Sequence, residues 1–210
     1  RSVVGAIVPK LEGAEIERTK RKVTADLNAY DYYLRALASL HQVSSYRTNE
    51  QALAFVRKAI GIDPDFASAF GLGAFCYTQR QAFGWMADRD RDVQEAAQLA
   101  RRAADLGRDD AVALAFAGQT LVYVAHDLDS GAALIDRALL LNPNSTVAWH
   151  WSGWVKIWVG EPEAGVERVT HAMRLSPMDP FIRGMQGTIA HGCFFASRHE
   201  EAASWALKTL

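Results

Sequence analysis

The sequence predicts an all-α protein, a solenoid in which pairs of helices follow one another along the chain. Two observations lead to this prediction. A six-residue motif, made of an apolar helical turn, a polar residue and a proline, occurs at 59–64, 138–143 and 172–177. Small residues precede each of these prolines at a constant spacing. Pro143 and Pro177 lie 34 residues apart, and a fixed period of this size is typical of helical repeats.

Each motif has the composition of a helix end, because proline cannot continue a helix. Asp65, Ser145 and Asp179 come next and are candidate N-caps of the following helices. The small or apolar residues before the prolines would let two helices approach closely. They are Ala52, Val56 and Ala59, then Gly131, Ile135 and Ala138, then Gly165, Val169 and Ala172, and Ala96, Ala100 and Ala103 keep the spacing where Arg108 replaces the proline.

The helix before each of these sets carries a second signature. Its members are Phe70, Gly73, Ala74 and Tyr77, then Leu114, Ala117, Gly118 and Leu121, then Trp149, Ser152, Gly153 and Lys156. Together the two sets resemble the tetratricopeptide repeat (TPR), which reads W-x2-L-G-x2-Y, then A-x3-F, then P. The resemblance covers roughly residues 28–210 and implies a right-handed α-solenoid of helix-turn-helix TPR repeats.

The register divides the chain into six parts. Residues 1–27 are expected to form a linker helix from a preceding domain, since 1–22 show an apolar face followed by charges and no repeat signature. Residues 28–210 are expected to form about five repeats, namely 28–66, 67–110, 111–145, 146–179 and a truncated 180–210. The last residues, Trp205 to Leu207, are apolar and show no polar capping surface. We therefore expect either a longer protein or self-association.

Composition excludes several classes of function. The formal net charge of -1 argues against a nucleic-acid binder driven by electrostatic attraction. No stretch approaches the roughly 18 apolar residues of a membrane span, and the N-terminal region lacks the apolar core of a signal peptide. Cys76 and Cys193 are interpreted as small buried thiols in a reducing compartment, in preference to a disulfide. We expect a cytoplasmic protein that does not bind membranes.

No motif predicts catalysis, a cofactor or a metal. The six histidines form no HExxH and no metal-ligand spacing with cysteine. No glycine-rich phosphate loop follows a strand, and neither G-x-S-x-G nor S-x-x-K is recognised. The segment is predicted not to be an enzyme.

The TPR resemblance implies a concave groove lined by the first helix of each repeat. At the family's groove-facing positions this chain has an aromatic, weakly polar lining without lysine or arginine. Chaperone-binding members clamp a terminal carboxylate with such charged donors, so this mode is disfavoured, whereas an apolar peptide or helix fits. Packing between helices is an equal alternative for Trp154 and Trp158. The expected groove residues are Tyr33, Leu37, Phe75, Gln79, Gln119, Tyr123, His150, Trp154, Trp158 and His191.

The second repeat carries about ten extra residues, across 80–92. Insertions in repeat proteins form loops, often near a binding face. Trp85 lies in this insertion and is a candidate for contact with a partner, although packing on its own repeat is the favoured interpretation. The charged run 88–92 is interpreted as a solvated helix start.

A narrower resemblance is carried by Leu27 to Arg35, with support from 14–18, 109–113 and 131–139. These segments look like the TPR region of a bacterial group common in rhizobia. In that group the repeats follow either a class III adenylate or guanylate cyclase domain or a winged-helix DNA-binding domain. The resemblance implies a role in signalling and assigns no catalytic or DNA-contacting residue to this chain.

Three functions remain open at this point. The first is a non-catalytic protein-interaction module that binds a peptide or helix in the aromatic groove. The second is an intramolecular regulatory or dimerising segment, whose partner is the protein's own N-terminal domain or a second copy of the chain. The third is an enzyme with an unrecognised site, which requires a cluster of acid and base side chains.

Overall fold

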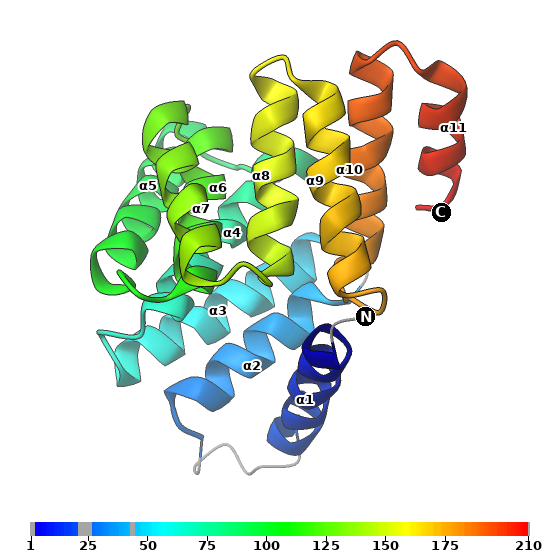
Figure 1. The fold of residues 1–210 in the computed structure, drawn as a ribbon. Coiled ribbons are helices and arrows are strands. Elements are labelled where there is room, and N and C mark those ends of the chain that lie inside the picture. The colour runs from blue at the N-terminus through cyan, green and yellow to red at the C-terminus, as the bar shows by residue number, and fades with distance from the viewer. Residues whose placement is uncertain (1–2, 21–26, 43–44, 210) are drawn as a thin grey trace.

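In a computed structural model, which describes residues 3–20, 27–42 and 45–209, the chain forms eleven helices and no strand within those ranges. Consecutive helices pack as antiparallel pairs, and the pairs follow one another along a curved path (Figure 1). The predicted all-α solenoid of helical repeats is thus confirmed.

The first helices of the five pairs are α2, α4, α6, α8 and α10, and the second helices are α3, α5, α7, α9 and α11. A further helix, α1, precedes the first pair and packs against α2. Their bounds are α1 Val3–Lys20, α2 Ala29–Leu40, α3 Tyr46–Ile62, α4 Ala67–Phe83, α5 Arg89–Leu106, α6 Ala111–Tyr123, α7 Leu128–Leu141, α8 Thr146–Trp158, α9 Pro162–Leu175, α10 Ile182–Phe195 and α11 His199–Leu207.

One of the three predicted N-caps is confirmed. The Ser145 hydroxyl accepts a hydrogen bond from the amide of Ala148 at the start of α8. The predictions for Asp65 and Asp179 are wrong, because α4 begins after Phe66 and α10 begins after Phe181. Asp179 instead fixes the turn before α10, where its carboxylate accepts a hydrogen bond from the Phe181 amide.

The turns inside four helix pairs share one backbone feature, a residue with positive φ. Glycine supplies it at Gly84 and Gly160, with φ of 70° and 84°. His126 and Ser197 adopt it with side chains, at 57° and 60°, although this region is sterically unfavourable for residues with a Cβ. The repeated left-handed residue reverses the chain direction after each first helix from α4 onward.

Small residues allow the helices of a pair to cross closely, as the sequence predicted. A Cβ added to Gly118 of α6 would lie 2.6 Å from the carbonyl oxygen of Gly131 in α7. The same arrangement recurs in the next pair, where a Cβ on Gly165 would lie 2.7 Å from the carbonyl oxygen of Gly153. Neither contact leaves room for a methyl group.

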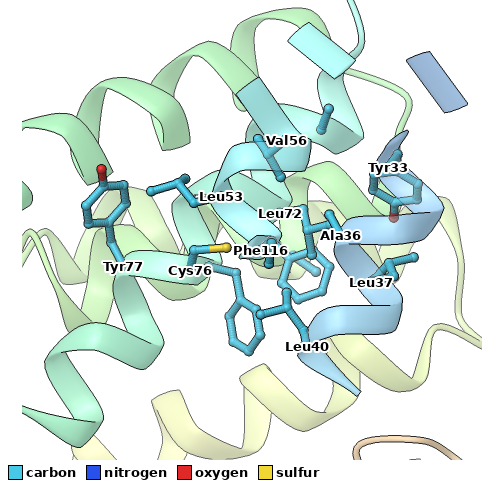
Figure 2. Close-up of a cluster of buried hydrophobic side chains, with 14 of the residues drawn as sticks. Tyr33, Ala36, Leu37, Leu40, Leu53, Val56, Leu72, Cys76, Tyr77 and Phe116 are labelled. Carbon is cyan, nitrogen blue, oxygen red and sulfur yellow. The ribbon is translucent and has the colours of Figure 1, made fainter. Parts of the chain in front are cut away.

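The largest hydrophobic core extends from Ile16 of α1 to Val155 of α8 without interruption. Figure 2 shows its central part, where Leu40 of α2, Cys76 of α4 and Phe116 of α6 lie together between the first helices. This core joins helix pairs that are not consecutive, and it therefore shapes the inner face of the solenoid.

Both cysteines are buried and free, as expected. Burial raises the pKa of the Cys76 thiol to about 12, so this residue is a small apolar side chain at neutral pH. Among the helices of the described residues, none combines the length and the apolar character needed to cross a bilayer.

Candidate functional site

The first helices of the pairs supply all ten predicted groove residues, but half of these residues are closed to a partner. Their side chains are between 3% and 8% exposed. A residue with so little accessible surface contributes to packing, so any contact surface is narrower than the sequence implied. The buried residues are Tyr33, Leu37, Phe75, Gln119 and His150.

The inner face is filled because aromatic rings from non-consecutive pairs meet across it. The ring centroid of Phe75 in α4 lies 5.4 Å from that of Trp151 in α8 and 6.0 Å from that of Phe181. Phe181 also lies 5.1 Å, centroid to centroid, from His41 at the end of α2. The curvature therefore brings the fifth pair against the first, and the groove between them is occupied by the chain's own side chains.

Four of the predicted residues form a continuous aromatic row, which we define as Tyr123, Trp158, Trp154 and His191. Tyr123 stacks on Trp158 with centroids 5.4 Å apart and planes 12° apart. Trp158 stacks on Trp154 at 5.2 Å and 23°, and Trp154 contacts His191 at 5.1 Å. The row crosses from α6 through α8 to α10.

The aromatic row is partly accessible to solvent. Trp158 is 36% exposed, His191 is exposed, and Tyr123 and Trp154 are half-buried. The row contains no Lys, Arg, Asp or Glu, and its members offer ring surface together with indole and phenol donors. Such amphipathic rings are the residue types that dominate binding energy at protein interfaces.

Polar contacts hold the two ends of the row in place. The Gln81 side-chain amide donates to the backbone oxygen of Tyr123 at 2.6 Å, at the C-terminal end of α6. His191 Nδ1 lies 2.8 Å from the carbonyl oxygen of Gly187, and because a carbonyl only accepts, Nδ1 carries the proton. These contacts fix the backbone at Tyr123 and the orientation of the His191 ring.

The two remaining predicted residues lie outside the row and already have partners. The Gln79 side-chain oxygen accepts from Asn49 Nδ2 at 3.2 Å, in a polar network that also contains Arg80.

Trp85, in the insertion of the second repeat, is half-buried and stacks on Phe83 with centroids 4.7 Å apart. The same insertion starts α5 with its charged run, where Asp88 accepts from the Arg91 amide, so the interpretation of the run as a helix start is confirmed.

Sequence reasoning missed two exposed aromatics that follow His191 on α10. Phe194 is 58% exposed and Phe195 is 61% exposed, and their ring centroids are 5.7 Å apart. The positions carried over from the TPR family end before these residues. Two consecutive phenylalanines near the end of a helix were the available signal, since both cannot face the same core.

Burial lowers the pKa of two of the histidines. His150 is buried and stacks on Trp151 with centroids 4.3 Å apart, and burial lowers its pKa to about 3. Burial also lowers the pKa of His41, which the nearby Asp179 carboxylate opposes. Within the ranges that the structure covers, no group of three or more His, Cys, Asp and Glu side chains could hold a metal ion.

Two surface hollows lie away from the aromatic row. One, of about 360 Å³, lies among α7, α8 and α9 and includes Lys156, Glu161 and Arg168. The other, of about 520 Å³, lies along α4 and α5 and includes Arg91 and Arg102. Their linings combine these charged side chains with apolar ones such as Ile135 and Leu99, and include no member of the aromatic row.

Comparison with known proteins bears on the fold. No protein-family model matches the chain, and no curated protein matches it. Among solved structures it is similar to TTC0263, a thermophilic TPR protein of Thermus thermophilus, at 14% identity over 87% of this chain and 90% of that chain, with a TM-score of 0.64. It is also similar to PilF of Pseudomonas aeruginosa, at 19% identity over 84% and 72% of the two chains, with a TM-score of 0.55. These likenesses extend to neither a cyclase nor a winged-helix domain, and they establish for this chain the α-solenoid fold of TPR proteins.

Proposed function

We propose that this chain is a protein-interaction module in which the aromatic row binds a peptide or a helix of a partner protein. The observation that carries the proposal is the continuous stack from Tyr123 to His191, partly exposed and spanning three helix pairs. A packing role alone would place these rings between helices, whereas Trp158 keeps more than a third of its surface in solvent.

The accessible chemistry favours an apolar or aromatic segment over a charged one. No Lys, Arg, Asp or Glu belongs to the row, so it offers neither a guanidinium nor an ammonium group for a carboxylate or phosphate. An extended segment or an amphipathic helix could place apolar side chains on the rings and accept hydrogen bonds from the indole N–H groups. The module needs no catalytic group, cofactor or metal for this role.

Substitution of Tyr123 and Trp154 by alanine tests the proposal. Peptides selected on the wild-type chain from a displayed random library should bind the double variant at least tenfold more weakly, because aromatic anchors account for most binding energy at such surfaces. Affinities are measured by calorimetry, after circular dichroism shows that the variant melts cooperatively. Tyr46→Ala removes an exposed aromatic from the first pair and should leave affinity unchanged. Equal binding by the folded double variant would disprove the role of the row.

A second candidate function is an intramolecular regulatory or dimerising segment, and the packing of α1 favours it. Ile16 of α1 is buried, and the Tyr30 hydroxyl of α2 donates to the Glu15 carboxylate at 2.6 Å. A helix that precedes the repeats thus packs on the first pair, and such a contact would couple a preceding domain to the repeats. If the segment dimerises, light scattering over a hundredfold concentration range should show a mass twice that of the chain at the upper end; a constant monomer mass would count against it.

The wider setting is proposed from the resemblance of 27–35 and its companion segments to bacterial signalling proteins. In that setting the module would serve a cytoplasmic cyclase or a winged-helix regulator, with the protein's own N-terminal domain as a second class of partner. Reading the native gene upstream of the codon for Arg1 tests this. A cyclase or winged-helix domain in frame would support it, and any other domain would reject it.

A further inference from the structure

Phe181 joins the fifth helix pair to the first and second by aromatic contact. Its ring lies edge-on to His41, with an interplanar angle of 80°, and edge-on to Phe75, with an angle of 89°. Edge-to-face packing is a favourable geometry for aromatic pairs. In a solenoid each repeat normally contacts only its neighbours, so a side chain of the fifth pair between rings of the first two is a departure that needs a reason.

This contact is made by helix ends, not by whole helices. His41 directly follows α2 and Phe181 directly precedes α10. Within the described part of the chain, α2 and α10 do not pack along their lengths. Phe181 therefore behaves as one side chain inserted into a surface, and it can leave that surface without separating two packed helices.

The turn that carries Phe181 is rigid. The Asp179 carboxylate accepts from the Phe181 amide at 2.9 Å and from the Thr146 hydroxyl of α8 at 2.9 Å. Pro177 and Pro180 restrict the backbone on both sides of Asp179. The backbone at Phe181 is thus held in position, and the ring can enter or leave the surface by rotation of its own side chain.

The surface that Phe181 covers has the features of a recognition site. Phe75 is buried beneath it and contacts Trp151. The indole Nε1–H of Trp151 is also buried, and it has no hydrogen-bond partner among the described residues. An unpaired buried donor is unfavourable, so an acceptor that a bound peptide brought to Trp151 would be stabilising.

We propose that His41 and Phe75 form a binding site for an aromatic side chain, that Phe181 is its internal occupant, and that a peptide bearing phenylalanine displaces Phe181. The chemistry of the partner follows from the occupant, because the site already accepts a phenyl ring edge-on between two rings. This site is separate from the aromatic row, and its existence does not depend on the function proposed for the row.

A peptide taken from the chain itself is the probe. The segment 178–182, acetylated and amidated, presents the phenyl group in its own sequence context. We expect the Phe181→Ala variant to bind this peptide at least tenfold more tightly than the wild-type chain does, as measured by tryptophan fluorescence. The same peptide with alanine in place of its phenylalanine should not bind the variant. Equal affinity of the two proteins, or equal binding of the two peptides, would overturn the proposal.

Further variants locate the bound peptide. Adding His41→Ala to Phe181→Ala removes one wall of the site and should abolish the gain in affinity; a gain that persists would place the peptide elsewhere and refute the proposal. Adding Tyr123→Ala and Trp154→Ala instead should leave the gain unchanged, which separates this site from the aromatic row. If Phe181→Ala does not fold, Phe181→Leu keeps the apolar bulk without the ring, and the same two comparisons decide.

Discussion

Replacement of Gly118 by leucine is expected to lower the free energy of unfolding by about 3 kcal/mol, the upper range for overpacking a tight interior. The Cβ alone would lie 2.6 Å from the carbonyl oxygen of Gly131 and 2.7 Å from a side-chain carbon of Ile135. The first of these atoms is backbone, so it cannot move aside by a rotamer change. Helices α6 and α7 would have to separate, and the loss is measured as a lower midpoint in urea.

Gly61 provides the matched control for this prediction. It lies in α3, and a Cβ added there meets no atom within 4 Å. Gly61→Leu should leave stability unchanged or raise it by up to about 1 kcal/mol, because glycine is a poor helix former. If Gly118→Leu unfolded at the wild-type midpoint, the close crossing of α6 and α7 would be wrong.

Acidification is expected to destabilise the fold through His150. Thr188 donates its hydroxyl proton to the Gly184 carbonyl at 2.9 Å, so the 2.7 Å contact between His150 Nε2 and the Thr188 hydroxyl oxygen has His150 as donor. Nε2 therefore carries a proton, and because burial lowers the pKa, the ring is neutral at pH 7. Protonation of Nδ1 would place a charge in a buried position.

The sign follows from the pKa, which burial lowers from 6.5 to about 3. Above pH 6.5 neither the folded nor the unfolded chain binds the proton, and this residue contributes no pH dependence. As the pH falls below 6.5, only the unfolded chain takes up the proton, so stability decreases until the folded pKa is reached. At a pH two units below the ordinary value, the loss is about 3 kcal/mol.

A conservative variant isolates this effect from that of the carboxylates, which also titrate in acid. His150→Gln can keep the donor to Thr188 and cannot be protonated. The slope of unfolding free energy against pH between 6.5 and 4.5 should be markedly smaller in this variant than in the wild-type chain. Parallel slopes in the two proteins would show that His150 does not control acid stability.

The fold could be predicted from sequence because its determinants are local and repeated. Proline after an apolar turn, and small residues such as Gly118 and Gly131 at fixed offsets, specify a helix pair and its crossing without reference to the rest of the chain. Each pair carries the same signature, so the repeat can still be recognised when one pair departs from it, as with Arg108 in place of proline.

The accessible surface could be predicted only in part, because it depends on contacts between distant pairs. The positions carried over from the TPR family assume an open concave face. Here the curvature brings Phe75 of α4 against Trp151 of α8 and against Phe181, which precedes α10. The sequence pattern does not determine how strongly the solenoid curves, so the burial of Tyr33 or Phe75 could not be predicted from it.

The contact between His41 and Phe181 also bears on how the chain folds. A linear repeat array can begin folding at any repeat and fray from either end, since its stability is a sum of neighbouring terms. Here the two ends of the array are tied together, and a loop containing most of the chain must close before that contact forms. Such a distant contact raises the contact order, which slows folding. It also couples the unfolding of the first pair to that of the fifth. The part of the array from α2 to the start of α10 should therefore melt as one cooperative unit.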